Sequence, residues 1–208
     1  MKNCYTELPV GYTEVYRLNL QKDKKKAILV NGIAMVMIVA LFFLGNAIVP
    51  LSTLFDMTDG EGVYFIRLGI LIGGYVIYII LHEAVHGIAM KCYGAPKLKF
   101  GFTGLYAFAG SEAYFSKVPY IVIALAPVVV WGLVLLVLNL IVPASWFWVI
   151  YFIQVGNLSG AAGDLYVTCK FIGMPKDILV QDAGVSMAVY SGSAEQKREH
   201  APDGQGDI

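Results

Sequence analysis

The segment GILIGGYVIYIILHEAVHGIAMKC, residues 69–92, decides how this chain folds. It belongs to an apolar stretch that is long enough, as a helix, to cross the roughly 30 Å of hydrocarbon in a bilayer. Three ionisable side chains, His82, Glu83 and His86, interrupt that stretch. Because ionisable groups are costly within hydrocarbon, their presence indicates a functional site.

These three residues form an H-E-x-x-H motif. On a helix, His82 and His86 lie one turn apart on one face, where two imidazole nitrogens can bind one zinc ion. Glu83 lies beside them and is placed to accept a proton from water that the metal activates. The alternative is a pair of histidines that only hydrogen-bond between helices, but it leaves Glu83 without a packing role.

The composition is typical of a membrane protein. Hydrophobic residues make up 58% of the chain, charged residues 14%, and the mean hydropathy is +0.67. Soluble domains carry about a quarter charged residues. No basic run is interleaved with aromatic residues, so we expect the lipid bilayer as a partner and no nucleic acid.

Four apolar stretches are long enough to span a bilayer, at residues 27–51, 63–90, 118–142 and 145–171. They predict an all-α transmembrane fold, a four-span helical bundle with a small β-hairpin at the cytoplasmic face. We expect residues 1–26 to be a cytoplasmic segment, residues 27–185 the membrane domain, and residues 186–208, which include His200, a disordered cytoplasmic tail. The first span begins too late and runs too long for a cleavable signal, so it reads as a retained anchor.

The flanking charges predict the orientation. Lysines cluster before the first span, between the second and third, and after the fourth, whereas the loop after the first span is acidic, with Asp56, Asp59 and Glu61. The positive-inside rule therefore places both termini, and the segment between the second and third spans, on the cytoplasmic side of the cell membrane.

That segment, residues 97–116, is rich in glycine and aromatic residues. Phe100 and Phe102 alternate with small or polar residues, which predicts a β-hairpin or re-entrant loop that pairs with substrate. Residues 12–20 also alternate, and they are either a strand joining that hairpin or an interfacial segment.

A third zinc ligand is needed, since catalytic zinc usually takes three protein ligands. Asp164 is the acidic residue of the fourth apolar stretch, at a depth similar to that of the histidines, and we take it as that ligand. Glu112, in the expected hairpin, is the alternative. Asn157 lies seven residues before Asp164, on nearly the same helical face, so its amide either binds substrate or an oxyanion or bonds between helices.

HEAVHGIAMKCYGAPKLKFGF, residues 82–102, resembles the corresponding stretch of site-2-protease-like intramembrane metalloproteases, and most closely a small zincin-peptidase membrane family, formerly a domain of unknown function. The resemblance covers about residues 65–185. It implies that His82, His86 and Asp164 bind Zn2+, that Glu83 is the base, and that Asn157 is the upstream Asn of the aspartate's motif. Leu165 and Tyr166 depart from that family's pattern, because glycine usually follows the aspartate.

We therefore expect a zinc-dependent, membrane-embedded endopeptidase that hydrolyses peptide bonds of membrane proteins or peptides. The alternative is a non-catalytic membrane protein with a structural metal site or a metal-handling role. The number of side chains on the metal separates the two, because a structural site is closed by a fourth protein ligand. The sequence predicts neither the substrate nor the oligomeric state.

Overall fold

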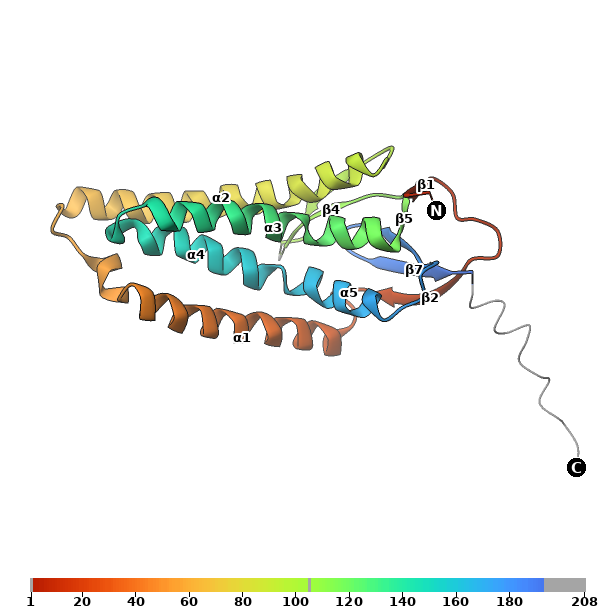
Figure 1. Ribbon diagram of the computed structural model, residues 1–208, viewed down its shortest axis with the longest axis horizontal. Helices are drawn as coiled ribbons and strands as arrows, with labels where there is room; N and C mark the ends of the chain where they lie inside the picture. Colours follow the sequence, from red (N-terminus) through yellow and green to blue (C-terminus); the bar gives the residue numbers. More distant parts are fainter. Residues whose placement is uncertain (1, 105, 193–208) are drawn as a thin grey trace, which may run out of the picture.

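The computed structural model describes residues 2–104 and 106–192, which form a helical bundle with a small sheet at one end (Figure 1). The helices of these residues are α1 (Lys24–Ile48), η1 (Leu51–Phe55, a 3-10 helix), α2 (Glu61–Cys92), α3 (Lys117–Ile141), α4 (Ala144–Gly160) and α5 (Ala162–Ile172). The strands are β1 (Cys4–Tyr5), β2 (Thr13–Leu18), β3 (Lys99–Phe102), β4 (Ala107–Gly110), β5 (Tyr114–Ser116), β6 (Leu179–Asp182) and β7 (Met187–Ser191).

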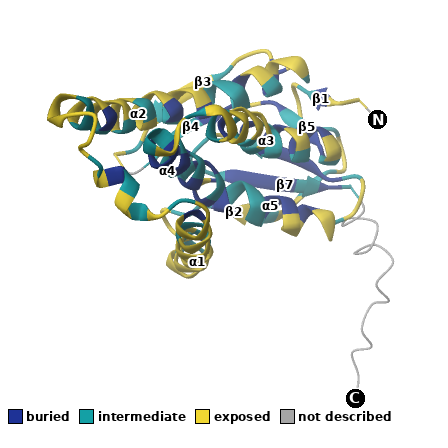
Figure 2. Ribbon diagram, turned by 60° about the vertical axis from the view of Figure 1, so that its left-hand side comes forward, coloured by how far each residue is buried: buried dark blue, intermediate teal, exposed yellow. Residues whose placement is uncertain are grey.

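Within the described residues, three helices are long and apolar enough to cross a membrane: α1, α2 and α3. Few of their side chains are buried, and those of α1 are mostly exposed, as its yellow ribbon in Figure 2 shows. Large apolar side chains on an unpartnered surface are expected where lipid is the solvent.

The expectation of an all-α fold with four spans is wrong. The described chain is mixed α/β, with a five-stranded antiparallel sheet, and it has three candidate spans. The stretch 145–171 fails as a span because its helix breaks at Ala161, between Gly160 and Gly163, leaving α4 with 17 residues. Glycine disfavours a continuous helix, and two glycines flank this break.

The five strands of the sheet come from distant parts of the chain, in the order β1-β5-β6-β7-β2. Each is only two to six residues long, too short for a clear hydrophobic period. Residues 12–20 do contain a strand, β2, but it pairs with β7 and not with the hairpin. The strand β7 also lies inside the expected disordered tail, so residues 187–191 are ordered and residues 193–208, with His200, lie outside the described residues.

The expected hairpin is present as β3 and β4, a separate two-stranded sheet with Lys99 paired to Gly110 and Phe102 to Ala107. It is shorter than residues 97–116, because β5 belongs to the larger sheet. The hairpin lies directly against α2, since a Cβ atom at Gly87 would come 2.5 Å from the Phe100 ring. Gly87 therefore lets β3 approach the helix that carries the H-E-x-x-H motif.

The main apolar core joins the sheet to the nearby helix ends. Phe115 of β5, Phe171 of α5 and Val180 of β6 are fully buried in it, together with Met90 of α2 and Ile123 of α3. The core fixes the sheet against the C-terminal end of α2 and the N-terminal end of α3. The H-E-x-x-H motif lies at this end of the bundle.

Candidate metal centre and active site

Helix α2 carries the two histidines close to its C-terminal end. His82 and His86 lie one turn apart, their ring centroids are 5.0 Å apart, and both side chains are about nine-tenths buried. The apolar run that makes α2 a candidate span also makes it continuous through the motif. The helical spacing expected from the sequence is therefore realised in the structure.

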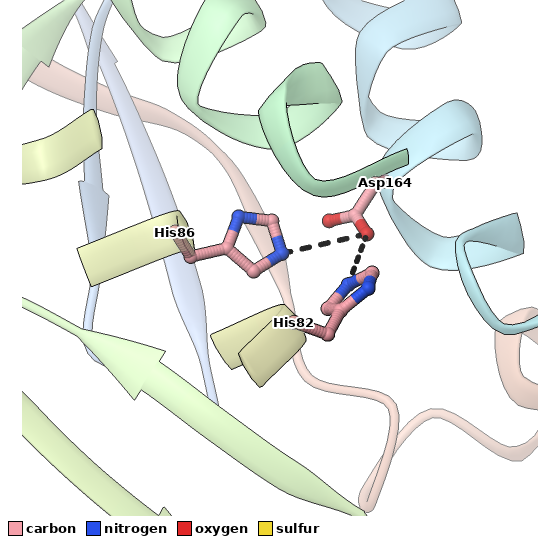
Figure 3. Close-up of side chains that lie close together, drawn as sticks. All are labelled: His82, His86 and Asp164. Carbon is pink, nitrogen blue, oxygen red and sulfur yellow. Dashed lines mark ion pairs between the residues drawn. The ribbon is translucent and has the colours of Figure 1, made fainter. Parts of the chain in front are cut away.

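Asp164 reaches the same point from α5. Its Oδ2 atom lies 3.9 Å from His82 Nε2 and 3.7 Å from His86 Nε2 (Figure 3). One ligand atom from each of these three residues lies within 4.8 Å of the others. Two imidazole nitrogens and one carboxylate oxygen form a donor set that zinc prefers, so the residues fit the metal that the motif implies.

The break between α4 and α5 is what positions Asp164. Because the helix ends and restarts at Ala161, Asp164 falls in the first turn of α5, where the helix dipole favours an anion. Helix α4 also comes close to α2, since a Cβ atom at Gly156 would lie 2.3 Å from the Tyr75 ring. This approach brings the start of α5 within reach of the histidines.

Within the described residues, this His–His–Asp group has no fourth histidine, cysteine, aspartate or glutamate. A structural zinc site is normally closed by four protein ligands, whereas a catalytic one keeps a position for water or substrate. The donor set therefore favours the catalytic type of site over the structural alternative.

Both histidines are held by hydrogen bonds from the ring nitrogen that faces away from Asp164. His86 Nδ1 lies 3.0 Å from the carbonyl oxygen of Ile123 in α3, and His82 Nδ1 lies 2.8 Å from the hydroxyl of Tyr78. Reasoning from the sequence missed Tyr78 and Ile123. The position of Tyr78, one turn before His82, was the only available signal for it.

A cavity of about 470 Å³ opens beside the metal-binding group. Glu83, His82, His86 and Asp164 line it, and its other walls come from α1, β2, β4, α4 and the turn between β6 and β7. The Glu83 carboxylate is half-buried and interacts with the backbone of Ala109 in β4. Glu83 thus lies between the metal-binding group and the hairpin.

Asp182, at the end of β6, lines the cavity and was not expected from the sequence. Its carboxylate accepts hydrogen bonds from the Tyr120 hydroxyl and from the Gly184 backbone N–H. Burial raises the pKa of the Asp182 carboxyl, although these hydrogen bonds act in the opposite direction. Because both oxygens have protein donors, Asp182 fixes the turn between β6 and β7 at the cavity wall.

The remaining candidate residues lie away from the cavity lining. Glu112 is exposed and pairs with Lys99, which lowers the pKa of the Glu112 carboxyl, and it is not part of the metal-binding group. Phe100 and Phe102 are both more than half exposed. Asn157 is fully buried, with its amide bonded to Tyr78 and to the Val128 carbonyl, which favours the interhelical alternative for this residue.

Comparison with protein families gives one match, over residues 75–179, to a family described as "Putative zincin peptidase". Comparisons with curated proteins and with solved structures gave no match. The matched region contains the whole of the H-E-x-x-H motif, the hairpin, α3 and Asp164. The match covers half of the chain, and the chain therefore belongs to this family, whose description implies Zn2+ as the metal and suggests a metallopeptidase.

Proposed function

We propose that this protein is a membrane-embedded zinc endopeptidase of the site-2-protease-like type, which hydrolyses peptide bonds of membrane proteins or peptides. The observation that carries the proposal is the His82–His86–Asp164 group, with Glu83 beside it, on a cavity at one end of three candidate membrane spans. In this proposal His82, His86 and Asp164 hold the metal and Glu83 is the catalytic base.

A zinc ion bound there supplies a Lewis acid that acidifies water and polarises a peptide carbonyl. Glu83 accepts the proton of the attacking water and then donates it to the nitrogen of the leaving amine. The half-buried position of Glu83 limits the water around this proton transfer.

Strand β4 offers a place for the substrate backbone. The Ser111 N–H donates to the Asp182 carbonyl, on the side of β4 that faces away from β3. Since backbone groups alternate along a strand, the N–H and C=O groups of Ala107 and Ala109 point to that same side, where the Ala109 backbone already interacts with Glu83. Ala107 and Ala109 also line the cavity, so an extended substrate can add to β4 beside Glu83.

Strand addition also explains how a transmembrane substrate becomes accessible to hydrolysis. A helix keeps its carbonyl groups in internal hydrogen bonds, so the scissile segment must unwind before attack. Pairing with β4 replaces the lost helical bonds, which are otherwise unsatisfied in an apolar environment.

The charge distribution supports an orientation with both termini in the cytoplasm. Among the described residues, Arg67 is the one lysine or arginine near the α1–α2 loop, and it is buried and paired with Asp59. The other described basic residues lie at or before the start of α1, from the last turn of α5 onward, and from the last turn of α2 to the first residue of α3. The positive-inside rule then places the sheet and the metal-binding group toward the cytoplasm.

The test is peptide hydrolysis by the reconstituted protein. The probe is a synthetic peptide with one 20-residue apolar helix, flanked by lysines and followed by an extended segment, in vesicles of neutral and anionic phospholipid. Mass spectrometry should detect cleavage by the wild type. Glu83→Gln should retain zinc and lose activity by about 10²–10⁴-fold, because the general base is removed.

Equal cleavage by Glu83→Gln would contradict the role of Glu83. Cleavage of soluble casein but not of the membrane peptide would contradict the membrane substrate. Stoichiometric zinc with no cleavage of either probe would support the alternative of a non-catalytic metal protein.

A further inference from the structure

We propose that α3, which carries no ligand of the metal-binding group, sets the tautomer and orientation of both zinc-binding histidines. It acts on His86 through the carbonyl of Ile123, and on His82 through the carbonyl of Val128 by way of Asn157 and Tyr78. The inference rests on the metal site and does not depend on peptidase activity.

The contact with His86 begins at Pro127. This proline lies inside α3, and in a regular helix its N–H would donate to the carbonyl of the residue four positions earlier, which is Ile123. Proline has no N–H, so the Ile123 carbonyl lacks its helical partner. That carbonyl lies 3.0 Å from His86 Nδ1, and because a carbonyl can only accept, Nδ1 must carry the proton.

The contact with His82 begins at the Val128 carbonyl. It accepts from the Asn157 Nδ2 atom at 3.2 Å, which fixes the orientation of the amide and turns Oδ1 toward Tyr78. The Tyr78 hydroxyl lies 3.0 Å from that oxygen and donates its single proton to it.

With its proton engaged, the Tyr78 hydroxyl can only accept from His82, whose Nδ1 lies 2.8 Å away. His82 Nδ1 therefore carries a proton. In the opposite arrangement Tyr78 would donate to His82, and Oδ1 of Asn157, a residue with no exposed surface, would lose its partner at a substantial cost.

The two hydrogen-bond connections, from Ile123 to His86 and from Val128 to His82, have the same consequence. With Nδ1 protonated on His82 and on His86, each Nε2 keeps a free lone pair, and each Nε2 faces Asp164 (Figure 3). A neutral imidazole with the second nitrogen held by a hydrogen bond is the form in which histidine binds zinc. Tyr78 and Asn157 are thus positioning residues. Pro127 acts by leaving the Ile123 carbonyl without its helical donor, so that it can accept from His86.

The test measures zinc affinity in detergent by competition with a chromophoric chelator. Tyr78→Phe should weaken zinc binding about tenfold, within the range found when partners of metal-binding histidines are removed. The matched control is Tyr151→Phe, which removes a hydroxyl that donates to the Leu41 carbonyl between α1 and α4. It should leave the affinity unchanged, so loss of a buried hydroxyl is separated from loss of the contact with His82.

Double variants distinguish the two hydrogen-bond connections. Asn157→Ala acts through Tyr78, so adding it to Tyr78→Phe should weaken zinc binding no further. Pro127→Ala restores an N–H that competes for the Ile123 carbonyl, and since it acts on the other histidine its effect should add to that of Tyr78→Phe. Pro119→Ala is its control, because Pro119 lies in the first turn of α3, where a helix N–H has no helical acceptor.

Wild-type zinc affinity in Tyr78→Phe, or an equal loss in Tyr151→Phe, overturns the proposal. If the losses of zinc affinity in Asn157→Ala and Tyr78→Phe are fully additive, the proposed connection from Val128 to His82 is wrong. The absorption spectrum of the cobalt-substituted protein checks that each variant is folded, since a tetrahedral cobalt spectrum at saturating metal requires an assembled site. A protein that shows these affinities but cleaves no peptide would contradict the proposed function and leave this inference intact.

Discussion

Asp164 is the residue on which the metal site depends, because it joins α5 to the two histidines of α2. Its carboxylate is within 4 Å of both imidazole groups, and it occupies the first turn of its helix. A carboxylate there is stabilised by the positive end of the helix, and a zinc ion shared with the two imidazoles would stabilise it further.

Replacing Asp164 should remove the metal. Wild-type protein is expected to contain about one zinc per chain by elemental analysis, and Asp164→Ala should contain far less after dialysis, because two ligands hold zinc more weakly than three. Glu112→Ala is the control, since Glu112 is exposed and bonded to Lys99, and it should keep its zinc. Zinc loss in Glu112→Ala, with zinc retained in Asp164→Ala, would make Glu112 and not Asp164 the third zinc ligand.

At the scale of elements, the strand next to the cavity is β4 and not β3. The alternation of Phe100 and Phe102 indicated a hairpin, but both side chains lie largely exposed and Phe100 packs against Gly87. The side that faces the metal-binding group is the open edge of β4, which contributes Ala107 and Ala109 to the cavity. Pairing between substrate and protein should therefore depend on the backbone of β4.

Proline substitution in the two strands tests this assignment. Ala107→Pro removes an N–H from the open edge of β4 and should strongly reduce cleavage of the transmembrane peptide, while zinc content stays the same. Phe102→Pro is the matched control. Phe102 is paired with Ala107, but its N–H points to the outer edge of β3, away from β4. The idea of strand addition to β4 fails if both variants, or neither, lose cleavage.

At the scale of the whole molecule, the sheet and the metal-binding group lie at one end of the bundle, and the α1–α2 and α3–α4 connections lie at the other (Figure 1). Within residues 2–104 and 106–192, the lysines lie at the end with the sheet. At the opposite end Arg67 is not a free charge, because it bonds to Asp59 and to the Asp56 carbonyl and stacks near Trp146. Unpaired positive charge is therefore concentrated at the end of the bundle that carries the sheet.

This asymmetry predicts the topology in cells. In a background in which Cys4, Cys92 and Cys169 are changed to serine, a cysteine at Glu61 should react with an impermeant maleimide added from outside. A cysteine at Lys176 should react only after the membrane is opened, since both positions are exposed in the protein and differ only in the side they face. The reverse pattern would place the active site toward the exterior.

The sequence alone identified His82, Glu83 and His86 as site residues, because their arrangement is local. His82, Glu83 and His86 lie within five consecutive residues, and a helix turns such spacing into a shared face. Apolar length likewise indicated α1, α2 and α3 as spans, and turn residues indicated the hairpin at β3 and β4. Each of these features depends on neighbours only a few residues apart.

Only the tertiary structure decided the features that depend on residues far apart in the chain. The sheet pairs β2 with β7 and β1 with β5, across more than a hundred residues in each case, and strands this short have too few residues for a periodic signal. The break at Ala161 turned an apparent fourth span into α4 and α5. The contacts that orient His82 and His86 join α2 to α3 and α4, so no local pattern could reveal them, and it is packing that brings these helices together.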